Sequence, residues 1–221
     1  MSVRWNALRD RIAVVGFTVA WTVLLLRIAP EIAAAGHVGL ALLGALVGYV
    51  LADAIAGTVH WIADRFFDPG TPVIGAVLIE PFRDHHDDAL GITRHDLFEV
   101  SGNNALVTLP VVVALASLPM PASAFGHFAL ATGASLTLAL FATNFFHRWA
   151  HAPVPPRGVR ALQRWGLILT PERHALHHRH DHDRAYCVTS GWLNPLFDRI
   201  GLFDRLEQLV GATRRRRRRT T

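Results

Sequence analysis

The sequence predicts an all-α integral membrane protein with about four transmembrane helices, interfacial helices and a histidine-rich cap on one side. Two observations support this fold class. Hydrophobic residues make up 51% of the 221 residues, and the mean hydropathy is +0.28, because long apolar blocks carry few charges. Most of the 13 histidines are clustered just outside those blocks, at spacings that place them on one helix face.

Four apolar stretches approach the length of about 20 helical residues that a bilayer requires. They cover residues 12–29, 32–51, 105–118 and 125–146. The first and third are short; Arg27 at the end of the first can extend to the interface, and Pro110 is expected to kink the third. Pro119 and Pro121 indicate a tight hairpin turn before the fourth stretch.

The second and fourth stretches are expected to continue past the membrane surface as unbroken helices. His60 and Asp64 extend the face of the second, and His147 and His151 extend the face of the fourth. Rigid helices that rise from the bilayer hold ligands more precisely than loops do. Farther on, residues 193–204 are expected to form an interfacial amphipathic helix with Leu, Ile and Phe on one face.

The positive-inside rule predicts the topology of the four stretches. Arg4, Arg9 and Arg11 precede the first, whereas the turn before the fourth has no charge, so both termini and all histidine clusters are expected in the cytoplasm, at a bacterial inner membrane. The basic start and the alanines at 33–35 also resemble a signal peptide, although we expect the first span to be retained. The whole chain, 1–221, is predicted to form a single domain.

Charge is concentrated at the end of the chain. The formal net charge is +5, but six of the 22 basic residues form the run 214–219, and the rest is nearly neutral. We therefore expect no nucleic-acid partner, and attraction of this arginine run to anionic lipid. The sequence has no lysine and a single cysteine, Cys187, which exclude Schiff-base chemistry and a thiolate-only metal site.

The clustered histidines are candidate metal ligands. Nine of them lie next to, or at helical spacing from, another histidine or, for His60, Asp64: His60, His85, His86, His147, His151, His174, His177, His178 and His182. This is more than one zinc ion requires, since structural zinc takes four ligands and catalytic zinc three. The number favours two ions, and a nitrogen-rich shell without thiolates favours a pair of iron ions that bind dioxygen.

Other polar residues nearby have more than one interpretation. Asp64 is expected either to coordinate metal or to orient His60, and either role makes it important for catalysis. His95, one turn before Glu99, is a further possible ligand or a partner of one. His180 is out of step with the cluster and is expected to be exposed. His37 and His127 are expected to serve packing and are excluded from the site.

Several motifs taken together resemble the plasmanylethanolamine desaturase family, also called Kua or CarF-type lipid desaturases. They are His60-Trp61-x-x-Asp64, the runs 82–88, 94–99 and 144–151, and the C-terminal run from His174 through His182 to Leu196. The resemblance covers about residues 45–205. It implies an integral-membrane, iron-dependent desaturase that uses dioxygen and two electrons from an external donor, of cytochrome b5 or ferredoxin type.

The resemblance also implies a phospholipid substrate. Known members convert an alkyl ether phospholipid to the vinyl ether of a plasmalogen, and a plant branch desaturates an acyl chain. Arg83, Arg94 and Arg148 lie beside the histidines and are candidates for head-group phosphate binding, or ordinary interfacial arginines. A hydroxylase with the same metal site, a zinc hydrolase and a membrane haem- or metal-binding carrier are the alternatives.

Overall fold

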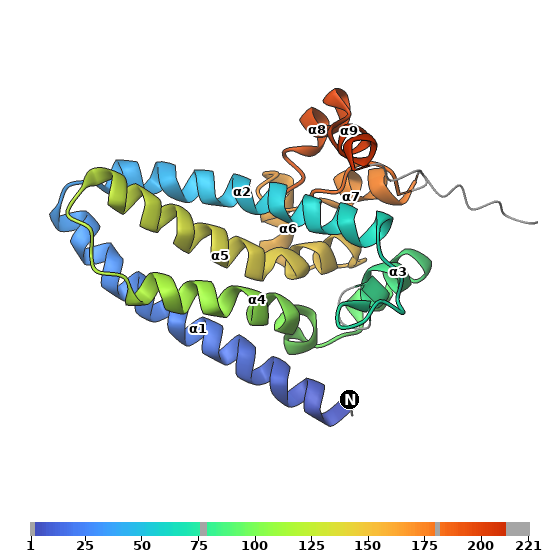
Figure 1. The fold of residues 1–221 in the computed structure, drawn as a ribbon, viewed down its shortest axis with the longest axis horizontal. Helices are drawn as coiled ribbons and strands as arrows, with labels where there is room; N and C mark the ends of the chain where they lie inside the picture. The colour runs from blue at the N-terminus through green and yellow to red at the C-terminus, as the bar shows by residue number, and fades with distance from the viewer. Residues whose placement is uncertain (1–2, 76–78, 180–181, 211–221) are drawn as a thin grey trace, which may run out of the picture.

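The computed structural model describes residues 3–75, 79–179 and 182–210, and in these ranges it contains helices and no strand. Four long helices form its body (Figure 1): α1 (Val3–Ala34), α2 (Val38–Arg65), α4 (Leu97–Ser117) and α5 (Ala124–His151). The shorter ones are α3 (Glu80–Asp87), η2 (Gly91–Thr93), α6 (Arg157–Arg164), α7 (Pro171–His178), α8 (Asn194–Ile200) and α9 (Leu202–Leu209). All four long helices are apolar enough to cross a membrane, which confirms the predicted fold class.

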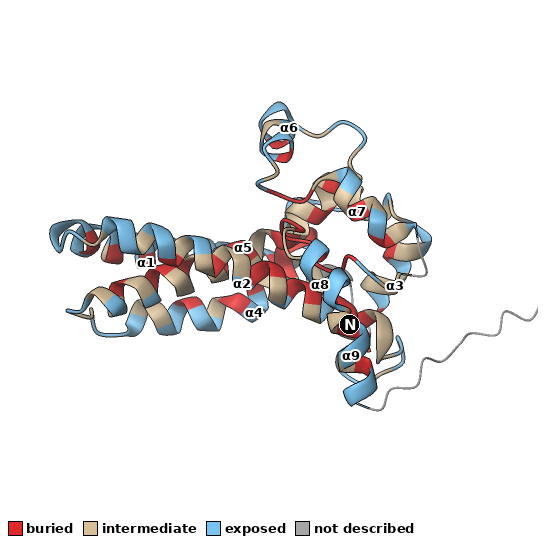
Figure 2. Ribbon diagram, turned by 90° about the horizontal axis from the view of Figure 1, so that it is seen from above, coloured by how far each residue is buried: buried red, intermediate tan, exposed pale blue. Residues whose placement is uncertain are grey.

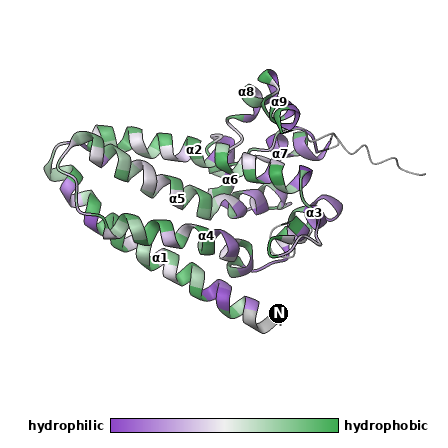
Figure 3. Cartoon of the chain, viewed as in Figure 1, coloured by the Kyte–Doolittle hydropathy of each residue, from purple (hydrophilic) through white to green (hydrophobic). Residues whose placement is uncertain are grey.

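The long helices pack as neighbours, with α2 along α5, α5 along α4, and α4 along α1. Large apolar side chains are exposed on their outer faces. Examples are Leu42, which is 67% exposed, and Val107, which is 74% exposed. Figure 2 shows this exposed surface along the bundle, and Figure 3 shows that hydrophilic residues gather at one end. A surface of this kind requires lipid rather than water around it.

Helices α2 and α5 are in unusually close contact. A Cβ atom on Gly48 would lie 2.2 Å from the carbonyl oxygen of Thr132, so only glycine permits this approach. The Ser135 hydroxyl donates a hydrogen bond across the contact to the carbonyl of Ala45, at 2.6 Å. Small residues at such a crossing are typical of membrane helices, whose association depends on packing and interhelical hydrogen bonds. The contact fixes the two helices that later carry His60 and His147.

The first helix is longer than the sequence suggested. Helix α1 runs through Pro30 and Ile32 to Ala34, so the second span begins at Val38 and not at residue 32. Pro30 lacks one backbone donor, but Ile28 and Ile32 on either side are buried in the core, and this packing keeps the helix going. The chain then reverses at Gly36, whose φ of +71° suits glycine.

The third span also starts earlier than expected, at Leu97 instead of residue 105. Asp96 is its N-cap: the carboxylate accepts hydrogen bonds from the backbone N–H groups of Phe98 and Glu99, and the Glu99 side chain accepts one from Asp96 N–H. This capping box is visible in the sequence as Asp96-x-x-Glu99. The expected hairpin turn follows Ser117, and Ser123 caps the start of α5.

The amphipathic segment near the C-terminus is two helices, not one. Helix α8 ends at Gly201, which has a φ of +59°, and α9 begins directly after it. Phe203 of α9 is buried against Trp61 of α2 and Tyr186. Part of the predicted lipid-facing surface therefore covers the protein interior, because the turn at Gly201 folds α9 back onto the end of α2.

Candidate metal centre

The predicted ligands come from four helices that meet at one end of the bundle (Figure 1). The ends of α2 and α5 provide His60 with Asp64 and His147 with His151. Helices α3 and α7 lie across this end and provide the remaining histidines. Both long helices are unbroken to their last ligands, as the sequence predicted. The N-terminal end of α1 lies at the same end of the bundle as the ligands, whereas the α1–α2 and α4–α5 turns lie at the other.

Two groups of ligand atoms form there. The five-histidine group contains His85, His147, His151, His174 and His178. The Asp64 group contains His60, Asp64, His86 and His177. Within each group the ligand atoms lie within 4.8 Å of one another. The adjacent pairs 85–86 and 177–178 each contribute one histidine to each group, so the two groups are next to each other.

In the five-histidine group, the Nε2 atoms are separated by the distances expected between nitrogens that bind one metal ion. Nε2 of His85 lies 3.0, 3.1 and 3.1 Å from those of His147, His151 and His178, and His147 lies 2.8 Å from His174. Two nitrogens bound at right angles to an ion about 2.1 Å away would be about 3.0 Å apart. One nitrogen has only a single proton or lone pair, so His85 Nε2 cannot make three hydrogen bonds here. A cation among the nitrogens satisfies them all.

The Asp64 group combines imidazoles with a carboxylate. Asp64 Oδ2 lies 3.4, 3.7 and 3.5 Å from the Nε2 atoms of His60, His86 and His177. His60 Nε2 and both Asp64 oxygens are buried without a hydrogen-bond partner in the described part of the chain. Buried polar atoms that converge without partners are costly unless an ion binds them. The donor set therefore fits a metal cation.

Outer hydrogen bonds orient two histidines of the Asp64 group. His60 Nδ1 donates to the carbonyl of Tyr186 at 3.1 Å, and His177 Nδ1 donates to the carbonyl of Arg184 at 2.7 Å. A proton held at Nδ1 leaves the Nε2 lone pair free for metal. In the five-histidine group, by contrast, Nδ1 of His85 and of His174 is buried without a partner among the described residues.

Burial keeps these imidazoles neutral. Loss of water, followed by the neighbouring histidines, lowers the pKa of His85 and of His86 to about 2 and that of His178 to about 3. The same causes lower the pKa of His174 well below its usual value. Neutral imidazole is the form that coordinates metal, so the histidines are ready to bind at neutral pH without first releasing protons.

Four of the described histidines named from the sequence fall outside both groups: His37, His95, His127 and His182. His182 stacks on His86, with ring centroids 3.9 Å apart, but it is not a member of either group. His95 is exposed and contacts Glu99 at 3.2 Å, because both lie at the capped start of α4, away from the ligands. His180 lies outside the described residues. His37 and His127 pair at 2.8 Å, across the α1–α2 turn and the start of α5.

The three arginines proposed for the head group are held by the protein. Arg83 donates to the carbonyl of Phe67 at 2.8 Å, and Arg148 donates to that of Thr93 at 3.2 Å. Arg94 is paired with the Asp88 carboxylate. These guanidinium groups brace the loops around α3 and η2, which leaves fewer donors for a phosphate.

Asp53 is an important residue that the sequence reasoning did not identify as part of the site. Its fully buried carboxylate accepts hydrogen bonds at 2.8–3.2 Å from four backbone N–H groups, those of Thr189, Ser190, Gly191 and Leu193. Gly57, one turn on, leaves room for Cys187, which a Cβ would approach to 2.6 Å. The C-terminal segment is thereby fixed on α2, and with it the carbonyls that orient His60 and His177. A buried aspartate inside an apolar span was the available signal.

The fold and site thus define a four-span membrane protein with two adjacent, histidine-rich groups at one end that could hold metal ions. Residues 49–221 match the family model of the lipid desaturase domain, and the chain belongs to this family. No solved structure matches it significantly.

Curated relatives carry related names. The chain is 42% identical to the plasmanylethanolamine desaturase of Myxococcus xanthus over 165 residues, which is 75% of this chain and 58% of that protein. It is 37% identical to plasmanylethanolamine desaturase 1 of Mus musculus, over 79% of this chain and 66% of that protein. It is 33% identical to the chloroplastic fatty acid desaturase 4 of Arabidopsis thaliana, over 76% and 50%. The chain matches about half to two thirds of the length of these relatives.

Proposed function

We propose that this protein is a di-iron lipid desaturase that converts a 1-O-alkyl (plasmanyl) ethanolamine phospholipid to the vinyl-ether plasmalogen. The observation that supports it most is the pair of adjacent nitrogen-rich groups at the end of four spans. When bound, a pair of iron ions would supply activation of dioxygen, with two electrons from a cytochrome b5-like or ferredoxin-like donor, and so allow hydrogen removal from an unactivated carbon. Family membership and the relatives' names support the same reaction.

The protein's own residues would hold and shield this chemistry. Eight histidines and Asp64 provide neutral ligands and one negative charge, and the buried rings of His60, His147, His174 and His177 exclude water from them. The apolar outer faces of the four spans keep the site next to the lipid phase. The two groups lie at the ends of α2 and α5, so in the proposed membrane orientation they would be at the depth of the first carbons of a lipid chain. This depth favours desaturation beside the glycerol.

The proposed membrane is the bacterial inner membrane, with both termini and the ligand groups on the cytoplasmic side. The arginines that precede the first span support this orientation. The arginine run 214–219, proposed to bind anionic lipid, lies outside the described residues.

The experiment is to express the protein in cells fed a 1-O-alkyl glycerol, with the His147→Ala variant as the inactive control. We expect mass spectrometry to find an acid-labile ether lipid two hydrogens lighter than its precursor, formed only by the wild type. A double bond in mid-chain would contradict the depth of the site. An added hydroxyl group in place of a double bond would show a hydroxylase.

Acyl-chain desaturation is the second candidate reaction, because some relatives are named fatty acid desaturases. This reaction would use the same metal ligands, at the same depth in the bilayer. A double bond beside the carboxyl carbon of a phospholipid acyl chain, with no vinyl ether formed, would favour it. One zinc ion per chain with hydrolase activity would exclude both desaturase reactions.

A further inference from the structure

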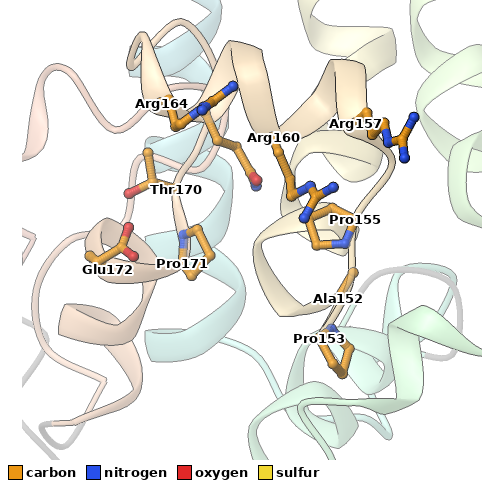
Figure 4. A pocket seen from close by; sticks show the side chains of 10 residues that line it. Ala152, Pro153, Pro155, Arg157, Arg160, Arg164, Thr170, Pro171 and Glu172 are labelled. Carbon is orange, nitrogen blue, oxygen red and sulfur yellow. The ribbon is translucent and has the colours of Figure 1, made fainter.

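A cavity of about 680 Å³ lies between the end of α5 and the start of α7, with α6 as its third wall (Figure 4). This volume is within the range of about 300–1,000 Å³ that is usual for small-molecule sites. Residues from all three walls line it: Ala152, Pro153, Pro155, Arg157, Arg160, Gln163, Arg164, Thr170, Pro171 and Glu172. None of them belongs to the ligand groups.

Three of the lining residues are arginines on one face of α6. Arg157, Arg160 and Arg164 are spaced three and four apart, so their guanidinium groups lie along the same side of the helix. All are exposed, and the described part of the chain offers them no hydrogen bond or ion pair. In this they differ from Arg83, Arg94 and Arg148, each of which donates a hydrogen bond within the protein. Unused guanidinium groups around a cavity suit a phosphate ester, which accepts paired hydrogen bonds.

Two buried side chains of α6, one of which also lines the cavity, hold the helix in place. They are Val159 and Gln163, and the Gln163 amide donates at 3.2 Å to the carbonyls of Trp149 in α5 and Leu169 before α7. The backbone of α6 is therefore fixed relative to both neighbouring ligand-bearing helices. An arginine row on such a helix is a preorganised site rather than a mobile charged surface.

The cavity lies beside the lipid phase. Figure 2 shows α6 to one side of the bundle, away from α8 and α9. Around it, Trp165 is 74% exposed and Val154 is 81% exposed, and Leu162 and Leu167 are exposed as well. Exposed tryptophan with aliphatic neighbours beside arginines is the composition of a membrane-interface segment. A phospholipid head group therefore reaches the cavity from the bilayer surface.

One lining residue has the opposite charge. Glu172 lies on the α7 wall, across the cavity from Arg157 and Arg160 (Figure 4). It is exposed and has no ion pair within the described residues. A carboxylate repels a simple anion but attracts an amine, so the cavity offers complementary charges to a group that carries a phosphate and an ammonium together.

The residues that line the cavity are also close in sequence to histidines of the five-histidine group. Ala152 directly follows His151, and Pro171 lies one turn before His174. Helices α5 and α7, which form two of the walls, carry four of the five histidines. The cavity is thus formed by the same segments that carry four of the five histidines.

We propose that this cavity binds the head group of the phospholipid substrate, with the arginine row on the phosphate and Glu172 on the amine. The proposal rests on the proposed desaturase function and adds to it the residues that select the lipid. It replaces Arg83, Arg94 and Arg148 as the principal phosphate contacts.

The test is lipid binding to the full chain in detergent, loaded with iron, measured as the dissociation constant for short-chain phosphatidylethanolamine. We expect Arg160→Gln to weaken binding roughly 10- to 100-fold, the usual effect of losing a charge-assisted hydrogen bond. Arg160→Lys is expected to be intermediate, because it keeps the charge but not the paired donors. Arg199→Gln is the matched control, since Arg199 is an exposed arginine on α8; it should bind like the wild type.

Glu172→Gln tests the amine contact. We expect weaker binding of phosphatidylethanolamine, with binding of phosphatidylglycerol of equal chain length unchanged or tighter. Equal iron content and thermal unfolding in every variant show that the protein is folded. The site assignment is overturned if Arg160→Gln binds like Arg199→Gln, or if Glu172→Gln leaves the preference between the two lipids unchanged. Inorganic phosphate or glycerophosphoethanolamine binding as tightly as the lipid would reveal a site for soluble phosphate esters and also overturn it.

Measurements of lipid binding and of catalysis distinguish this proposal from the proposed function on which it rests. A wild type that forms vinyl ether, together with an Arg160→Gln variant whose KM is unchanged, contradicts the cavity assignment alone. A wild type that forms none, but binds phosphatidylethanolamine in a manner that depends on Arg160 and Glu172, contradicts the proposed reaction and supports the site.

Discussion

The two ligand groups differ in charge and in the hydrogen bonds that support their ligands from outside. The Asp64 group has three imidazoles and a carboxylate, and carbonyls hold Nδ1 of His60 and His177, whose side chains are fully buried. The five-histidine group has neutral ligands only, and Nδ1 of His85 and of His174 has no hydrogen-bond partner among the described residues. With iron bound, the Asp64 group is therefore predicted to hold its ion more firmly than the five-histidine group. The predictions below test this difference.

The largest effect is expected from His147→Ala and His151→Ala. Each removes an imidazole that a rigid helix directs into the five-histidine group, so we expect activity to fall by more than about 100-fold while the protein stays in the membrane. Product analysis with membrane fractionation measures both. Near-normal activity in either variant would place the reaction at some other site.

Asp64→Asn is expected to be nearly as damaging, although the side chain keeps its shape. It removes the one negative charge of the Asp64 group, so we expect iron to fall from about two ions per chain to about one. Metal analysis of the purified protein decides it. Full activity with two ions bound would remove Asp64 from the site and leave a carboxylate buried for no evident reason.

Chelation should release the two ions at different rates. A chelator added to the iron-loaded protein is expected to remove the ion of the five-histidine group first, because the Asp64 group adds a carboxylate and has the Nδ1 atoms of His60 and His177 hydrogen-bonded to carbonyls. Iron release is followed with time, and Asp64→Asn should lose the slow phase. A single phase in the wild type would mean that the groups are equivalent.

A smaller and more selective effect is expected from Asp53→Asn. The amide accepts hydrogen bonds less strongly than the carboxylate, so we expect a loss of about 2 kcal/mol in the free energy of unfolding and a loss of about tenfold in activity. The loosened segment carries the carbonyls bonded to His60 and His177, so iron should be lost from the Asp64 group. Loss of iron from the five-histidine group instead would show that Asp53 does not act through this segment.

The smallest effects are expected from His95→Ala and His180→Ala. Among the described residues, the side chain of His95 pairs with Glu99 at the start of α4, and His180 is out of step in the sequence with the helical series of candidate ligands. Activity within about twofold of the wild type is the expected result, as is usual for surface substitutions. A His180 variant as impaired as His147→Ala would show that the register of the C-terminal cluster is wrong.

Much of the fold was determined by local sequence. Long apolar stretches fixed four spans, and the spacing of His60 with Asp64 and of His147 with His151 predicted that two helices continue beyond the membrane. These features depend on helical periodicity, which acts over a few residues. The errors at Ile32 and Leu97 have local causes as well: a proline that core packing overrides, and a capping box that was overlooked.

Only the tertiary structure shows which histidines belong to each of the two ligand groups and which residues surround these groups. Adjacent residues such as His85 and His86 point to different groups because a helix turns by about 100° per residue, and only the placement of α3 and α7 shows which group each one meets. The same holds for Asp53, whose four backbone donors lie more than 130 residues away. It holds also for the α6 arginines, whose exposed side chains have no hydrogen bond or ion pair among the described residues, whereas Arg83 and Arg148 donate to backbone carbonyls. Sequence names the chemical groups, but contacts between distant segments determine which of them meet a ligand.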